Sequence, residues 1–309
     1  MATKEKTVVK TEETKEVIKH SFYGGKVIIE AKPWGDTYRY TIDKRSGILS
    51  NTGITKNLDK SKALLPWAIG LVGSHIKSSL EVRTSKTFTK EEIFLLVDEA
   101  VLKPDEAKVK GGQTGDAIHD YAHKFAKAVM TKSPLPEIPK ELFAKEKDGD
   151  AEAIKTLNGI NGFLDFYNGH KVEFIAMEKL TYYNSFLAGD TKAGEEVIEF
   201  LGIIDLVAKV DGKVGVWDYK TGKAIYSDQR YQLSGYRKSW NANPDNKKVF
   251  AVESGILNFN KETGELDLFR CSNEESEKDY KAFLGLHSVA LREKELEAEY
   301  RNNKKNESK

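Results

Sequence analysis

"LGIIDLVAKVDGKVGVWDYK", residues 201–220, contains two apolar runs that are separated by Asp-Gly. This dipeptide between two such runs is a strong signal for a two-residue β-hairpin turn, here at 211–212. Continued outward from that turn, the pairing places Asp205 directly opposite Asp218. The stretch therefore predicts two neighbouring antiparallel strands that carry facing carboxylates.

The facing carboxylates need a physical explanation. Directly paired side chains project to one sheet face with Cβ atoms about 5 Å apart, so Asp205 and Asp218 repel each other unless one is protonated or a cation binds both. Magnesium fits, because it takes carboxylate, water and phosphate oxygens. Lys220 shares the face and would orient or deprotonate a water, or neutralise charge on a phosphate. A plain Asp218–Lys220 ion pair, with Asp205 solvated, stays open, and a one-residue slip would separate the groups.

Composition narrows the classes of protein. The chain has 309 residues, of which 39% are hydrophobic and 31% charged, enough for a real hydrophobic core. Its net charge of +1 does not indicate a nucleic-acid partner, although a local basic groove is compatible with this charge. The single cysteine, Cys271, excludes an intramolecular disulfide framework and any four-cysteine zinc or iron–sulfur site. Without a membrane-spanning run or a signal-peptide pattern, we expect a cytoplasmic location.

The order of elements predicts a mixed α/β fold with the sheet mainly in the second half of the chain. We expect a flexible charged arm over 1–20, a hairpin and helices packed on the core over 21–110, the core over 111–300 and a polar tail over 301–309. Separate helices are expected over 89–102 and after the Gly-rich residues 111–112.

Four elements, taken in order, resemble the PD-(D/E)XK nuclease superfamily in its RecB-like branch. They are a histidine in a helix after a Gly-rich start ("GQTGDAIHDYAH"), Gly-x-x-Asp ("GIID"), Asp-x-Lys ("DYK") and Gln-x-x-x-Tyr ("QLSGY"). The matching residues are His119, Asp205, Asp218, Lys220, Gln232 and Tyr236.

The resemblance implies a restriction-endonuclease-like core, with a central mixed β-sheet flanked by helices. It implies a Mg²⁺- or Mn²⁺-dependent deoxyribonuclease, an exonuclease in phage or bacterial recombination or repair. Asp205 and Asp218 would bind the metal through their carboxylates, His119 through its ring and Tyr219 through its backbone carbonyl. Lys220 would position or activate the attacking water.

The resemblance also implies contacts with DNA and with a possible recombination partner protein. Gln232 and Tyr236, one helical turn apart, would line the site and contact the phosphate backbone. Glu178 matches a glutamate that often precedes the Gly-x-x-Asp strand, although a polar insertion at 189–197 follows it here. Without four cysteines or a Walker A loop, the protein would be a stand-alone nuclease that lacks an iron–sulfur cluster.

Other readings use the same residues. A non-catalytic DNA-binding or assembly protein on this fold is the main alternative. His119 and His123 have zinc-ligand spacing, but Asp120 stands where a metalloprotease needs Glu, and a third ligand is missing. The interpretation as a His-Asp phosphohydrolase would depend on the His119-Asp120 dipeptide alone. The other histidines, His123 included, are interpreted as structural.

Overall fold

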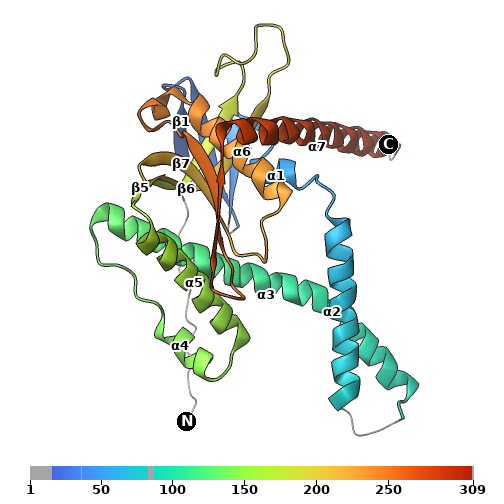
Figure 1. Ribbon diagram of the computed structural model, residues 1–309. Coiled ribbons are helices and arrows are strands. Elements are labelled where there is room, and N and C mark those ends of the chain that lie inside the picture. Colours follow the sequence, from blue (N-terminus) through green and yellow to red (C-terminus); the bar gives the residue numbers. More distant parts are fainter. Residues whose placement is uncertain (1–15, 36, 83–86, 308–309) are drawn as a thin grey trace, which may run out of the picture.

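The structure is a computed structural model that describes residues 16–307 except 36 and 83–86. Its first part is a small antiparallel sheet in the order β1-β2-β3-β4 (Figure 1). The strands are β1 (Ile18–Phe22), β2 (Val27–Trp34), β3 (Thr37–Ile42) and β4 (Arg45–Ser46). This sheet packs on the main sheet through a buried apolar cluster that includes Ile29, Leu180 and Tyr182.

The main sheet has five strands in chain order, and it is mixed. The strands are β5 (Val172–Asn184), β6 (Glu199–Val210), β7 (Lys213–Lys220), β8 (Glu253–Phe259) and β9 (Leu266–Cys271). β7 and β8 are parallel, and the other neighbours are antiparallel. The crossover between β7 and β8 contains α6 (Ser227–Ala242), as a parallel connection requires.

Helices cover both faces of this sheet. They are α1 (Asn51–Thr55), α2 (Ser61–Val82), α3 (Lys90–Thr131), α4 (Lys140–Lys147), α5 (Ala151–Gly169), α6, the 3₁₀ helix η1 (Pro244–Val249) and α7 (Asn273–Glu307). The C-terminal half of α3 and α5 pack on one face around Phe163 and Trp217. α6 packs on the other face around Val216 and Trp240. The expected fold class, a mixed sheet flanked by helices, is confirmed.

The β6–β7 hairpin forms as the sequence predicts. Asp211 and Gly212 occupy the turn with φ of 51° and 88°, the left-handed conformation that this type of two-residue turn requires. The backbone pairs run from Val210↔Lys213 to Leu206↔Trp217. The register is therefore the expected one, and the ladder ends one step before Asp205 and Asp218.

The segment boundaries differ from the expected ones. β1 begins at Ile18, within the range expected for a flexible arm, and residues 1–15 of that arm lie outside the described part of the chain. α7 continues to Glu307, so most of the expected tail at 301–309 is helical. The two helices expected over 89–102 and after 111–112 are one 42-residue helix, α3. In the described part of the chain, no helix is both long and apolar enough to cross a membrane.

Candidate active site

The Asp205 and Asp218 carboxyl groups meet where β6 and β7 stop pairing. Asp218 is 2% exposed, and its carboxyl group lies close enough to that of Asp205 for the two to interact. Burial raises the pKa of Asp218 to about 7; the positive charge of Lys220 opposes this rise and the charge of Asp205 adds to it. Burial also raises the pKa of Asp205. The structure thus brings together two carboxyl groups that repel when both are ionised.

The side chains of β6 depart from strict alternation next to Asp205. Ile204 and Val207 both pack in the cluster on the α6 side, while Leu206 packs on the α3 side, so strict alternation fails at Asp205. Asp205 Oδ2 accepts a hydrogen bond from the backbone N–H of Tyr219 at 2.8 Å. The carboxylate therefore takes the place of a strand partner for this N–H, which holds it at the end of β7.

Lys220 lies beside the pair and forms an ion pair with Asp218. Burial alone would lower the pKa of the Lys220 ammonium, but the charges of Asp218 and Asp205 raise it above its ordinary value. A general base must lose its proton near neutral pH, and this lysine stays charged in its surroundings. In this arrangement Lys220 supplies a positive charge directly beside the two carboxyl groups.

His119 reaches the site from α3. Its ring packs edge-on against Tyr219, with ring centroids 5.6 Å apart and an interplanar angle of 81°. Burial, with help from the charge of Lys220, lowers the pKa of His119, against the opposing charges of Asp218 and Asp116. The imidazole is therefore favoured in its neutral form, which is the form that binds metals. Asp116, one helical turn earlier on α3, is a neighbour that the sequence motifs did not single out.

Glu178 lies next to Asp205 on the other neighbouring strand. The β5–β6 pairs Met177↔Leu206 and Lys179↔Ile204 flank it, so it stands opposite Asp205. Its φ of 43° is uncommon for a residue with a side chain, and such backbone strain is often found at functional sites.

His123 contacts this glutamate. Its Nδ1 lies 3.3 Å from Glu178 Oε2, and the charge of Glu178 in turn raises the pKa of Asp205. His123 is therefore a neighbour of the site, connected to Asp205 through Glu178. Its spacing from His119 was noted in the sequence, but nothing in that spacing pointed to Glu178.

Gln232 and Tyr236 reach the site from α6. Gln232 Nε2 donates to the Tyr236 hydroxyl at 3.0 Å and to Thr52 Oγ1 at 2.8 Å. Burial and the charges of Asp218 and Asp205 raise the pKa of the buried Tyr236 phenol, which therefore stays protonated. Thr52 belongs to α1, far away in the sequence, and no motif could have identified it.

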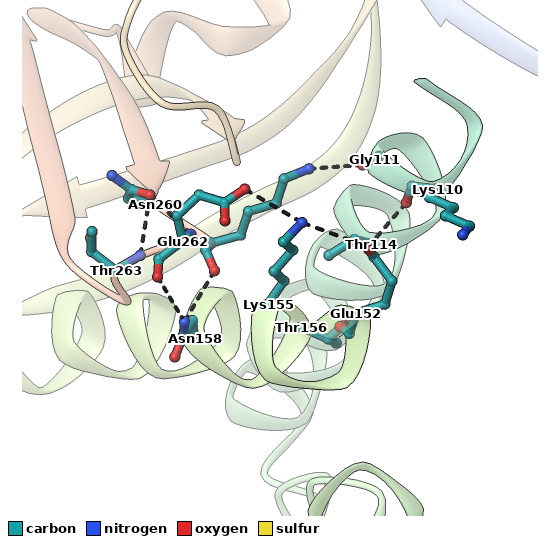
Figure 2. A network of polar contacts seen from close by, with 11 residues as sticks. Lys110, Gly111, Thr114, Glu152, Lys155, Thr156, Asn158, Asn260, Glu262 and Thr263 are labelled. Carbon is teal, nitrogen blue, oxygen red and sulfur yellow. Dashed lines mark hydrogen bonds and ion pairs between the residues drawn. The ribbon is translucent and has the colours of Figure 1, made fainter. Parts of the chain in front are cut away.

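A polar network fixes the part of α3 that precedes His119 (Figure 2). Lys261, in the β8–β9 turn, donates from Nζ to the Gly111 carbonyl at 3.1 Å. Thr114 donates to Glu152 of α5 at 2.7 Å. Asn158 of α5 in turn donates to the carbonyl of Lys261 at 3.1 Å. The network joins α3, α5 and the β8–β9 turn, and so sets the distance of His119 from the sheet.

The donor atoms suit a hard divalent cation. In the ranges that the structure describes, no group of three or more His, Cys, Asp or Glu side chains is already arranged to hold a metal ion. Two carboxylates with water and substrate oxygens form a set that Mg²⁺ accepts. Burial and the charge of Asp205 raise the pKa of Asp218, so a bound cation would favour the ionised pair. The residues present therefore fit a divalent ion bound mainly by Asp205 and Asp218, with His119 beside it.

Comparison with known families decides the class of this site. The family model of the PD-(D/E)XK nuclease superfamily matches residues 93–304, more than half of the chain. The chain belongs to this superfamily. As a PD-(D/E)XK nuclease, it falls in a class that hydrolyses phosphodiester bonds of DNA with divalent metal ions. The match covers all the predicted site residues but begins after α1, so Thr52 lies outside it.

Other comparisons add little to this assignment. No curated protein matches the PD-(D/E)XK chain. Among solved structures, the one described as "Crystal structure of SSO0001" is 12% identical, over 72% of this chain and 84% of that chain, with a TM-score of 0.28. A TM-score of this size supports no statement about fold or function.

Proposed function

We propose that this protein is a Mg²⁺- or Mn²⁺-dependent deoxyribonuclease, and specifically an exonuclease of phage or bacterial DNA recombination or repair. The observation that carries the proposal is the junction of Asp205, Asp218 and Lys220 at the end of the β6–β7 ladder, inside the family match. A buried carboxylate pair with an adjacent charged lysine is unfavourable for stability alone, and it is a useful arrangement for phosphodiester hydrolysis.

The acidic residues and Lys220 would have different roles at the reacting phosphate. Asp205 and Asp218 would hold the divalent ion with the Tyr219 carbonyl, and His119 would complete its surroundings. When bound, the ion would lower the pKa of a water and stabilise charge on the phosphate. Lys220, beside Asp218, would orient or activate the attacking water and neutralise the developing charge.

The α6 residues would hold the substrate. The Tyr236 hydroxyl is a hydrogen-bond donor, and phosphate oxygens accept such bonds; Gln232, which donates to this hydroxyl, would line the site beside it. Thr52 accepts from the Gln232 amide and fixes its direction. Glu178, contacted by His123, would line the site next to Asp205. The substrate phosphate would therefore lie between α6 and the ends of β6 and β7.

The proposal is tested by DNA degradation with purified variants. Asp218→Ala and Lys220→Ala should abolish Mg²⁺- or Mn²⁺-dependent degradation while the circular-dichroism spectrum is unchanged. Lys209→Ala, at the other end of the hairpin, is the matched control; it removes only the exposed ion pair with Glu173. Activity that survives in a folded Asp218→Ala protein would overturn the site.

End-labelled linear and circular DNA, single- and double-stranded, tests the exonuclease assignment. Linear DNA should be consumed while circular DNA resists, because an exonuclease needs an end. Cleavage of circular DNA at the same rate as linear DNA would show that the protein is an endonuclease and not an exonuclease. The non-catalytic alternative predicts DNA binding without cleavage, and a calorimetric titration with Mg²⁺ would then find no site that depends on Asp218.

A further inference from the structure

Two helices form a hairpin that projects from the main sheet and its covering helices (Figure 1). α2 packs against the N-terminal part of α3 and contributes no buried residue. In the same part of α3, only Leu96 and Ala100 are buried among the described residues that precede Thr114. The hairpin is thus held to the body at one end and surrounded by solvent over most of its length.

The hairpin nevertheless carries an apolar surface. Six side chains define what we call the hairpin surface, and each is more than half exposed: Leu65, Ile69, Phe94, Leu95, Val101 and Leu102. Exposed apolar side chains in this number, on two helices that pack together, are typical of an interaction site. A helix that is apolar around much of its circumference is normally covered, so the hairpin surface requires an occupant.

Charge narrows the choice of occupant. The 22 residues of α2 include only two lysines and no arginine, and residues 90–110 of α3 carry four lysines against six acidic residues. DNA binding and adsorption to an anionic membrane both need clustered basic side chains, which this helix lacks. No described helix is apolar enough to cross a membrane either. A protein surface of the same apolar character remains as the occupant with matching chemistry.

The size and spacing of the hairpin surface fit a second copy of the chain. Each of the six side chains exposes on the order of 100 Å². Together with the remaining exposed apolar side chains of α2 and α3, the hairpin offers roughly 1,000 Å², and a stable interface needs about 800 Å² per partner. Phe94 and Val101 are seven residues apart, as are Leu95 and Leu102, which is the repeat that packs helix against helix.

We propose that the hairpin surface is covered by the same hairpin of a second copy of this chain, so that four helices pack around a shared apolar core. Such an interface is self-complementary, because each copy presents the same apolar stripes. α3 continues without a break from this surface to His119. The assembly would therefore hold the active sites of its two copies at fixed positions relative to each other.

The first test is the molar mass of the full-length chain, measured by light scattering and sedimentation velocity at 1–50 µM, roughly the range of cellular self-association. We expect the mass of two chains or more. The double variant Leu95→Lys, Leu102→Lys should dissociate at least 10-fold more readily, because it places charges in the packed seam. Val289→Lys, at an exposed apolar position of α7, is the matched control and should leave the mass unchanged.

Either of two results overturns the proposal: a wild-type protein that is monomeric throughout, or a Leu95→Lys, Leu102→Lys variant that keeps the assembled mass. A monomer that binds neutral phosphatidylcholine vesicles would assign the hairpin surface to a lipid instead. A monomer that binds none would leave it to a different protein.

A cysteine-scanning test locates the contact. Cys271 is buried and is the only cysteine, so Cys271→Ser supplies a background without thiols. Ile69→Cys, Leu95→Cys and Leu102→Cys are introduced singly and treated with a flexible bismaleimide cross-linker, which also joins equivalent positions away from the two-fold axis. At least one should form a cross-linked dimer, while Val289→Cys should not. Failure of all three to cross-link would exclude the hairpin-on-hairpin contact, whatever the molar mass.

Discussion

Asp218→Asn removes one of the two adjacent carboxylates and keeps the size of the side chain. The pKa of Asp218 rises from 3.8 to about 7 in the folded protein. One pH unit corresponds to about 1.4 kcal/mol, so ionising this buried group costs about 4 kcal/mol of stability. Relaxation of the buried site reduces such costs, and we expect about 2 kcal/mol. In the absence of metal at pH 8, the variant should therefore be more stable than the wild type by about that amount.

The sign follows from proton binding. Between about pH 4 and pH 7 the folded state binds a proton at Asp218 that the unfolded state has released, so wild-type stability decreases as the pH rises through this window. Asp218→Asn lacks this group, and its stability curve should be flatter. The difference between the two proteins should shrink toward pH 4 and vanish only well below the unfolded pKa of 3.8, where both states carry the proton.

The assay is urea unfolding with EDTA at pH 4 to 8.5, roughly the span of the two pKa values, repeated with excess Mg²⁺. Mg²⁺ should stabilise the wild type and leave Asp218→Asn unchanged. Asp211→Asn is the matched control in the same hairpin. The His170 and Lys171 hydrogen bonds lower the pKa of Asp211, so its loss should weaken the protein above that pKa, the opposite sign. An Asp218→Asn protein that is less stable than the wild type at pH 8 without metal would refute the reasoning.

Three further outcomes are expected. Lys220→Met should reduce the rate of DNA hydrolysis about 10²- to 10³-fold in single-turnover kinetics, while the stabilisation of the fold by Mg²⁺ stays unchanged. A variant that loses hydrolysis and Mg²⁺-dependent stabilisation to the same extent would show that this lysine acts in folding or metal binding instead. Thr52→Val removes the hydroxyl that accepts a hydrogen bond from the glutamine of the Gln-x-x-x-Tyr motif, and it should raise KM several-fold. Thr52→Ser should restore the wild-type KM, and a change in kcat alone would contradict this role. Gly202→Ala places a Cβ 2.6 Å from the Tyr236 ring and should lower the free energy of unfolding by about 1–3 kcal/mol, measured by thermal unfolding. Gly70→Ala, whose Cβ would meet no atom within 4 Å, should be neutral or stabilising. Equal effects of the two substitutions would show that the strand around Gly202 can shift away from the ring.

The sequence by itself determined the hairpin and the order of the motifs. Asp-Gly between two apolar runs fixes a turn through the backbone conformations of two adjacent residues, and that turn sets the register up to Leu206 and Trp217. The same register predicted that Asp205 and Asp218 lie close together, and the structure places them close together. Signals that act over a few residues are therefore reliable here.

Other features were decided by contacts between distant segments. The Gly-rich residues 111–112 indicated a break, yet α3 runs through them, because Lys261 of the β8–β9 turn and Glu152 of α5 hold this part of the helix.

Only the tertiary structure placed Thr52 beside Gln232 and gave Glu178 its left-handed backbone next to Asp205. It also ended the β6–β7 pairing next to Asp205, whose carboxylate accepts the hydrogen bond of the Tyr219 N–H. These contacts join residues between 14 and 180 positions apart. Short-range patterns encode local backbone geometry, whereas such pairings exist only after the sheet and its covering helices have packed.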